Sequence, residues 1–161
     1  MTAEEQRETF RQVLSHFPTG VVVVTGMTPD GPAGLAVGSF ASVSLEPPLV
    51  GFFVALSSTS WPPISPSGHF CVNLLASAQS DVCRTFARSG GDKFAGVSWT
   101  RSKGGSPVLD GVVAWVDCEV EREIETGDHQ LVIGRVLDLE VANGEAPLLF
   151  HRGSFPNFEV V

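Results

Sequence analysis

The residues of this chain that can do chemistry gather in four short stretches, and the first is Ser57-Ser58-Thr59. It places three hydroxyls and three backbone amides directly after an apolar run. Such a group can donate several hydrogen bonds to a phosphate. An ordinary polar turn has the same composition, so this stretch alone predicts either a phosphate-binding loop or an exposed one.

Basic residues form the second stretch, in a chain whose formal net charge is −8. Half of its ten Lys and Arg residues lie close together in the sequence: Arg84, Arg88, Lys93, Arg101 and Lys103. A local excess of positive charge attracts anionic ligands. Arg84 and Arg88 are four residues apart, so a solvated helix face is the alternative explanation.

The two remaining stretches contain histidine. His129 follows Gly127-Asp128 at an expected hairpin turn, where it either points into a cleft or is simply exposed. Phe150-His151-Arg152-Gly153-Ser154-Phe155 combines an imidazole, a cation and aromatic rings near the end of the sequence. A planar anionic ligand can stack on such a group, although an exposed tail would look the same.

Serine hydroxyls also interrupt a small and apolar run from Gly34 to Val50. The run predicts two strands joined by a turn at Pro47-Pro48. Because side chains alternate along a strand, Ser42 and Ser44 are expected on one face and Ser39 on the other. A hydroxyl in this core-like setting needs a partner, either the sheet backbone or a ligand.

Several classes of function are disfavoured by what the sequence lacks. It has no G-x-G-x-x-G or P-loop, no H-E-x-x-H and no G-x-S-x-G, so the usual nucleotide, zinc-protease and hydrolase motifs are missing. His69, His129 and His151 are too scattered to predict a metal site. The acidic balance argues against nucleic acid and anionic membranes as partners.

The cysteines and the N-terminus favour a cytoplasmic location. Cys71, Cys83 and Cys118 show no C-x-x-C spacing and lie among apolar residues, which predicts reduced core thiols. Met1 to Glu5 shows no apolar signal region, and no apolar run approaches the roughly 20 residues that span a bilayer.

The elements that must position these residues are mostly strands. Thr2 to Glu5 has the spacing of a capping box, which predicts a first helix ending near Phe17. A second helix is expected from Gln79 to Gly90-Gly91. Strands are expected at residues 21–24, 34–56, 70–75, 112–124, 131–141 and 148–150, with a polar loop at 101–110.

The strand at 112–124 shows the clearest pattern. Its even positions are apolar, and its odd positions include Asp117, Glu119, Glu121 and Glu123, which predicts one buried and one wet face. Six or seven short strands with few helices favour a mainly β, antiparallel barrel carrying peripheral helices. With 161 residues, one domain spanning 1–161 is expected.

Taken together, the chain resembles the flavin reductase-like proteins of the FMN-binding split-barrel fold. The resemblance runs from about Phe17 to Phe155, and no single motif carries it. The segments that match the family, in the same order, are Phe17 to Thr25, Gly38 to Val50, Ser57 to Pro62, Ser67 to Leu75, Asp92-Lys93-Phe94, Gly127-Asp128-His129 and His151 to Phe155. The chain departs from the family at Val37-Gly38, where asparagine is usual before Ser-Phe, and at Phe155, where tyrosine is usual.

The resemblance implies a set of site residues. The segment lining the flavin ring and ribityl chain would be Gly38, Ser39, Phe40, Ala41 and Ser42. Ser57, Ser58 and Thr59 would hold the flavin phosphate, with Lys93 and Phe94 near the cofactor. His129 would lie near the nicotinamide, and His151, Arg152 and Phe155 would belong to the segment closing that side.

The implied activity is reduction of FMN, or of FAD, by NADH or NADPH through hydride transfer. Many members of the family supply reduced flavin to a partner monooxygenase, and the family is typically a homodimer with flavin at the subunit boundary. Two alternatives stay open from the residues. One is a non-catalytic flavin carrier or sensor of the same fold, and the other is a split-barrel enzyme with flavin as a tight prosthetic group.

Overall fold

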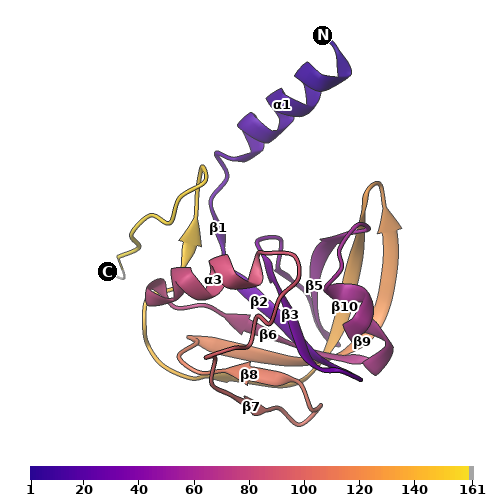
Figure 1. Cartoon of the computed structure of the whole chain (residues 1–161), viewed down its shortest axis with the longest axis vertical. Coiled ribbons are helices and arrows are strands. Elements are labelled where there is room, and N and C mark those ends of the chain that lie inside the picture. Colours follow the sequence, from indigo (N-terminus) through magenta and orange to yellow (C-terminus); the bar gives the residue numbers. More distant parts are fainter. Residues whose placement is uncertain (160–161) are drawn as a thin grey trace.

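The computed structural model describes residues 1–159. Its main sheet has seven antiparallel strands in the order β3-β2-β6-β9-β10-β5-β4 (Figure 1). The strands are β2 (Val22–Thr28), β3 (Gly31–Val37), β4 (Ala41–Leu45), β5 (Pro48–Ala55), β6 (His69–Leu74), β9 (Ala114–Thr126) and β10 (His129–Val141). The edge strands β3 and β4 are not paired with each other within residues 1–159, so the curved sheet is split between them. The prediction of a mainly β, antiparallel fold is confirmed.

The main core lies inside the curved sheet. Phe52, Trp61 and Phe70 are fully buried and meet edge to face, with ring centroids 5.3–5.7 Å apart. Aromatic rings favour this geometry because the positive edge of one meets the negative face of another. Trp61 opens the short helix α2 (Trp61–Ile64), so this cluster fixes the segment that follows β5.

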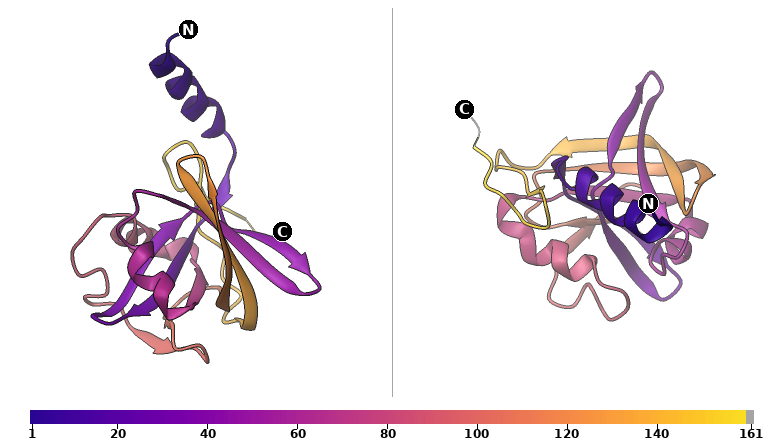
Figure 2. Two further views of the ribbon diagram at one scale, coloured as in Figure 1. Left: turned by 90° about the vertical axis from the view of Figure 1, so that its right-hand side faces the viewer. Right: turned by 90° about the horizontal axis from the view of Figure 1, so that it is seen from above.

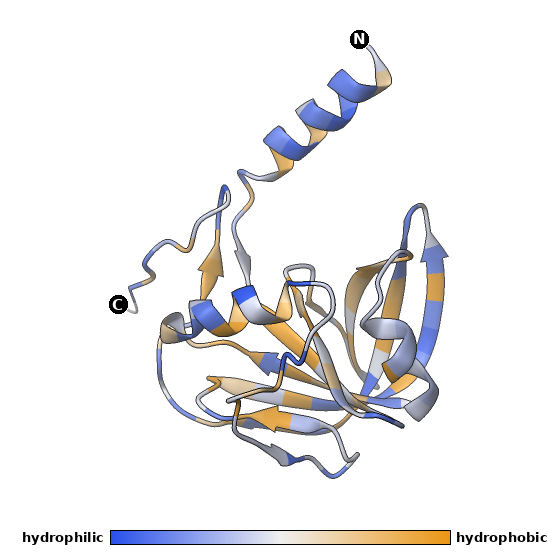
Figure 3. Cartoon of the chain, in the orientation of Figure 1, coloured by the Kyte–Doolittle hydropathy of each residue, from blue (hydrophilic) through white to orange (hydrophobic). Residues whose placement is uncertain are grey.

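The first helix, α1 (Ala3–Leu14), begins at the predicted capping box. The Glu5 amide donates to the Thr2 hydroxyl, and the Thr2 amide donates to the Glu5 carboxylate. This helix projects from the sheet and has no buried residue (Figures 1 and 3). Its apolar residues Phe10, Val13 and Leu14 therefore lie exposed in the single chain.

A second helix, α3 (Ser80–Phe86), packs over β2 and β3 and covers a second apolar cluster around Leu75, Phe86 and Leu109. It ends at Phe86, earlier than the predicted Gly90-Gly91. The Lys93 ammonium donates to the Phe86 carbonyl at 3.1 Å, and a cation at a helix C-terminus satisfies a carbonyl that the helix leaves unpaired. Single 3₁₀ turns occupy Ser65–Ser67 and Ser77–Gln79.

Residues 101–110, expected to be a loop, are largely a small hairpin. Its strands β7 (Trp99–Arg101) and β8 (Pro107–Leu109) pair antiparallel. The buried Asn73 side chain accepts from the Leu109 amide at 2.8 Å and donates to the Val23 carbonyl at 3.1 Å. These hydrogen bonds tie the hairpin to the main sheet, a link that local sequence does not reveal.

The predicted wet face of β9 is wrong at Asp117, which is fully buried. Its carboxylate accepts hydrogen bonds from the Ser102 hydroxyl at 2.7 Å and from the Gly104 amide at 2.9 Å. The loop before β8 therefore covers the sheet here and satisfies the buried charge. Glu119, Glu121 and Glu123 are exposed as predicted.

The run from Gly34 to Val50 also differs from its prediction. Gly34 to Val37 ends β3, and β4 and β5 meet at Pro47-Pro48 as expected. The register shifts by one residue between Ser42 and Ser44, which pair with Val50 and Leu49. Because of this bulge the two serines do not share a face. Ser39 and Ser42 are exposed rather than buried in the core.

Two short segments far apart in the sequence form a separate two-stranded ribbon. Its strands are β1 (Thr19–Gly20) and β11 (Leu149–Phe150).

Cys71, Cys83 and Cys118 are buried and free, as predicted, and burial raises the pKa of the Cys118 thiol to about 12. Within the described residues, no helix combines the length and apolar character needed to cross a membrane.

Candidate functional site

The segment 38–40 crosses the split between the two edge strands, and Ser39 anchors it. The Ser39 hydroxyl donates to the Phe53 carbonyl at 3.1 Å and accepts from the Phe53 amide at 2.9 Å. One side chain thus satisfies both backbone groups of a β5 residue just beyond the point where β4 stops pairing. Ser39 therefore holds the crossing segment against β5.

Gly38 and Phe40 flank this anchor. A Cβ atom at Gly38 would lie 3.2 Å from the Thr19 hydroxyl, so the segment passes close to β1 and a larger residue would disturb it. Phe40 packs toward the main core and also lines a small apolar crevice with Val21 and Leu74. Its ring supports the fold, which leaves the exposed backbone of residues 38–42 for a ligand.

The loop of residues 57–60, the hydroxyl loop, follows β5. Its serines have different roles. The Ser58 hydroxyl accepts from the amides of Ser60 and Trp61, at 3.2 and 3.3 Å, and so shapes the entry to α2. Ser57 and Thr59 are exposed. The hydroxyls of Ser57 and Thr59 therefore stay available to a ligand.

Glu123 on β9 binds the segment that directly follows this loop. Its carboxylate accepts from the Trp61 indole at 2.6 Å and from the Ser65 hydroxyl at 3.0 Å. Charged acceptors make the stronger hydrogen bonds in proteins. The residues after Thr59 are thus fixed by both the aromatic core and a carboxylate, which keeps the loop preorganised.

Lys93 lies beside the hydroxyl loop and is bound to protein oxygens. Its ammonium donates to the Gly34 carbonyl, the Ser60 hydroxyl and the Phe86 carbonyl, each at 3.1 Å. Burial lowers the pKa of Lys93, and no carboxylate pairs with it in the described part of the chain. An unpaired cation in a partly dry place attracts an anion.

A cavity of about 280 Å³ adjoins this cation. It is lined by Thr59, Ser60, Lys93, Phe94 and the Gly90-Gly91 turn, among others. Thr59 contributes an exposed hydroxyl to this cavity, and Lys93 contributes a positive charge that no carboxylate pairs with in the described residues, although its three N–H donors are bound to protein oxygens. The Asp92 carboxylate also lines the cavity. A positive charge and a free hydroxyl suit a phosphate group. Of the three residues expected to hold the flavin phosphate, Thr59 lines this cavity and Ser57 and Ser58 do not. Lys93 and Phe94, expected near the cofactor, line it as well.

His129 begins β10 and lies at the other side of the hydroxyl loop. It pairs in register with Ala55, and the Leu56 amide donates to the Asp128 carbonyl at 3.0 Å. Its Nδ1 lies 2.7 Å from the Asp128 carboxylate, and this hydrogen bond lowers the pKa of Asp128. An ionised carboxylate can only accept, so Nδ1 carries the proton and Nε2 is left for a ligand.

The segment 151–155 forms a tight turn beside β1. His151 and Ser154 exchange backbone hydrogen bonds at 2.9 and 3.0 Å, with Arg152 at φ 50° and Gly153 at φ 78°. The Arg152 amide donates to the Ser15 carbonyl, which ties the turn to the end of α1. The Phe155 ring stacks under the Arg84 guanidinium, 5.1 Å from its centroid.

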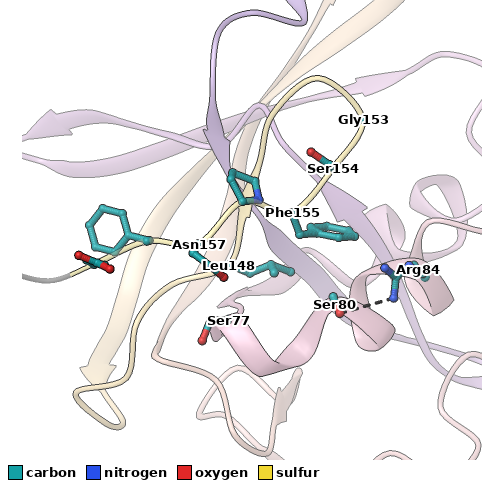
Figure 4. Close-up of a pocket in the computed structure, with 11 residues that line it drawn as sticks. Ser77, Ser80, Arg84, Leu148, Gly153, Ser154, Phe155 and Asn157 are labelled. Atoms are coloured by element: carbon teal, nitrogen blue, oxygen red, sulfur yellow. Dashed lines mark hydrogen bonds between the residues drawn. The ribbon is translucent and has the colours of Figure 1, made fainter.

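Phe155 and Arg84 border a broad cavity of about 700 Å³ between α3 and the C-terminal segment (Figure 4). Ser77, Ser80 and Asn157 also line it. His129 lines a different cavity, beside α1. The single chain therefore does not bring His129 and the 151–155 segment to one place, although both were expected on the nicotinamide side.

The predicted basic cluster is also divided by the fold. Arg84 borders the broad cavity, and Lys93 lies beside the hydroxyl loop. Arg101 stacks on Trp99, and Lys103 pairs with Asp138 at 3.2 Å. Nearness in the sequence therefore did not predict a shared electrostatic site.

The contacts of three supporting residues had no sequence signal. Ser60, Thr19 and Glu123 each act through a partner distant in the sequence, namely Lys93, Gly38 and Trp61. No motif or periodicity marks such pairs. Within residues 1–159, no three His, Cys, Asp or Glu side chains are grouped to hold a metal ion.

Comparison with known proteins agrees with this geometry. The flavin reductase like domain family matches residues 14–159. A flavin reductase of Pseudomonas putida is 51% identical over 153 residues, covering 94% of this chain and 90% of that protein. Since the family matches nearly the whole sequence, the chain belongs to the flavin reductase-like family.

Solved structures show the same fold. Nitrilotriacetate monooxygenase component B from Mycobacterium thermoresistibile superposes with a TM-score of 0.94 at 42% identity, covering 98% of this chain and 89% of that one. The NADH:FAD oxidoreductase SgcE6 of Streptomyces globisporus, solved with NAD and FAD fragments, superposes with a TM-score of 0.90 at 33% identity, covering 99% and 96%. The split-barrel class expected from the sequence is thereby confirmed.

The cation beside the hydroxyl loop leads to the first prediction. Lys93→Met keeps much of the side chain's bulk but removes the positive charge, so we expect the Kd of FMN to rise about tenfold. Riboflavin lacks the phosphate, and its Kd should change much less. Fluorescence titration of both flavins checks this, with Arg88→Met as the charge-matched control. Equal weakening of both flavins would show that Lys93 only supports the loop.

Proposed function

We propose that this protein is an NAD(P)H:flavin oxidoreductase that reduces FMN, or FAD, and supplies the reduced flavin to a partner monooxygenase. The observation that carries the proposal is membership of the flavin reductase-like family across residues 14–159. The hydroxyl loop with its adjacent unpaired cation agrees with it. The relatives described above are a flavin reductase, a monooxygenase component and an NADH:FAD oxidoreductase, which supports both cofactors and the partner class.

The protein's task in this reaction is to hold two ligands. Bound flavin would accept a hydride, and a nicotinamide would donate it, so the cofactors supply the chemistry. The chain contributes orientation: Ser57 and Thr59 bind the phosphate, and Ser39 holds residues 38–42 in place for the ring. Holding reacting groups in a near-attack geometry removes most of the entropic cost of the step.

His129 is proposed to position the nicotinamide. Its Nδ1–H donates a hydrogen bond to Asp128, so Nε2 is the ring nitrogen left for a ligand, and it accepts a hydrogen bond when the ring is neutral. A carboxamide N–H is a matching donor. No proton transfer is needed for hydride transfer between the rings, so we assign His129 a positioning role.

The experiment that tests the function is steady-state oxidation of NADH, and separately NADPH, with and without added FMN, FAD or riboflavin. We expect turnover that requires free flavin and saturates with it. Flavin binding without turnover would contradict the proposal and indicate a non-catalytic flavin carrier or sensor. Turnover with retained colour after extensive dilution would mean that flavin is a prosthetic group.

The role of His129 makes a second prediction for the same assay. His129→Ala should raise the KM for NADH by about tenfold, because one hydrogen bond to the nicotinamide is lost. The KM for flavin should change little. His129→Gln, which keeps a polar side chain, should partly restore the NADH value. An equal rise in both constants would contradict the assignment.

We also propose that the protein is a homodimer. Apolar side chains lie exposed on the β4–β5 hairpin, which projects from the body (Figure 2), on the end of β10, and on the last part of α1. Leu45 is 92% exposed, Val141 73% and Phe10 66%. Monomers seldom expose so much apolar surface, and a second copy related by a two-fold axis would cover it.

The projecting hairpin tests the dimer. Leu45→Asp should convert the dimer to a monomer, because it places a charge in an apolar interface. Leu45→Met should leave the dimer intact. Light scattering after size-exclusion chromatography measures both masses. A wild-type mass near the 17.1 kDa of one chain would refute the proposal.

A further inference from the structure

His129 lines a cavity whose other wall is α1. This cavity measures about 860 Å³, and its lining residues are Ala3, Gln6, Arg7, Phe10, Arg11, Asp128 and His129. The first part of α1 lies over the tip of the β9–β10 hairpin in both views of Figure 2. The volume of this cavity falls within the range of small-molecule sites.

The charges along that wall are unusual for this protein. Arg7 and Arg11 are one helical turn apart and both line the cavity, whereas Glu4, Glu5 and Glu8 of the same helix do not. Arg7 makes one loose ion pair with Glu4, at 3.5 Å, and both partners are largely exposed. Arg11 has no side-chain ion pair or hydrogen bond among residues 1–159. In a chain of net charge −8, two available guanidinium groups on one wall favour an anionic ligand.

The remaining charges of the cavity lie at its other end. Asp128 is the only carboxylate among the residues that line it, and its charge is engaged by the His129 ring. Negative charge therefore sits beside the imidazole, and positive charge lies along the helix. A ligand with a neutral ring at one end and phosphates further along matches this separation.

We infer that α1 forms one wall of the pyridine dinucleotide site, and that Arg7 and Arg11 bind the dinucleotide's phosphates while His129 holds the nicotinamide. The inference rests on the proposed function, since it names how the hydride donor is recognised. Arginine suits this role because its planar fork donates paired hydrogen bonds to phosphate oxygens. Residues one turn apart on a helix can each contact one phosphate of a diphosphate.

The test uses Arg7→Gln, Arg11→Gln and the double variant of the full chain. Both positions of α1 involved, Arg7 and Arg11, are solvent-exposed, so the fold is expected to persist, as circular dichroism would verify. Arg88→Gln, an exposed site after α3, is the control for the change in net charge.

Two hydride donors, one with phosphates and one without, distinguish a loss of phosphate recognition from a general loss of activity. The KM for NADH should rise about tenfold in Arg11→Gln and further in the double variant. The rate with 1-benzyl-1,4-dihydronicotinamide, which has no phosphate, should stay at the wild-type value, as should the KM for FMN. Equilibrium binding of NADH, followed by its own fluorescence, should weaken in parallel and lose part of its salt dependence.

The outcomes distinguish this inference from the proposed function. Unchanged NADH binding in the double variant would overturn the inference and leave the reductase function standing. Equal losses with NADH and the benzyl donor would also overturn it. If the wild-type protein oxidises neither donor with any flavin, the proposed function itself fails.

Discussion

The arrangement of this site depends on one gap in the sheet. Seven antiparallel strands leave β3 and β4 as unpaired edges, and the chain itself crosses between them in three residues. Unpaired backbone groups at a sheet edge need partners. β4 stops pairing with β5 before Phe53 is reached, and Ser39 satisfies the Phe53 amide and carbonyl with a single hydroxyl. The crossing segment is therefore held in one conformation beside β1 and β5.

Charge is distributed in the molecule so that a few cations remain unpaired near cavities. Lys93 is bound only by neutral oxygens, and Arg11 has no side-chain partner in the described residues. Elsewhere charges are compensated: Asp117 by a hydroxyl and an amide, Lys103 by Asp138. An acidic protein can thus remain soluble through its net charge and still present positive potential where anionic ligands would enter.

The hydroxyl loop links the two ligand sites that we propose. Before it, Ala55 pairs with His129 across β5 and β10. At its end, Ser60 contacts Lys93, and Trp61 follows and enters the aromatic core. One rigid connection of a few residues therefore separates the side expected to bind phosphate from the side expected to bind nicotinamide. Rigid support of this kind sets the relative position of two bound ligands.

The sequence by itself determined those features that local patterns encode. The capping box of α1, the turn at Pro47-Pro48, the buried cysteines and most strands follow from spacing and periodicity. The family also followed from ordered short segments. The early end of α3 and the β7–β8 hairpin did not follow from such patterns, because no motif marks the contact of Lys93 with Phe86 or that of Asn73 with Leu109.

Only the tertiary structure decided which chemical groups meet. Lys93 contacts Gly34 from 59 positions away, and α1 faces His129 from the other end of the chain. The tertiary structure also buries Asp117, which the alternating pattern of its strand had placed on the exposed face. A loop with matching hydrogen-bond donors covers this carboxylate. Periodicity reports which face of an element is apolar. Which partner covers that face depends on the packing of the whole chain, and that packing has no local pattern.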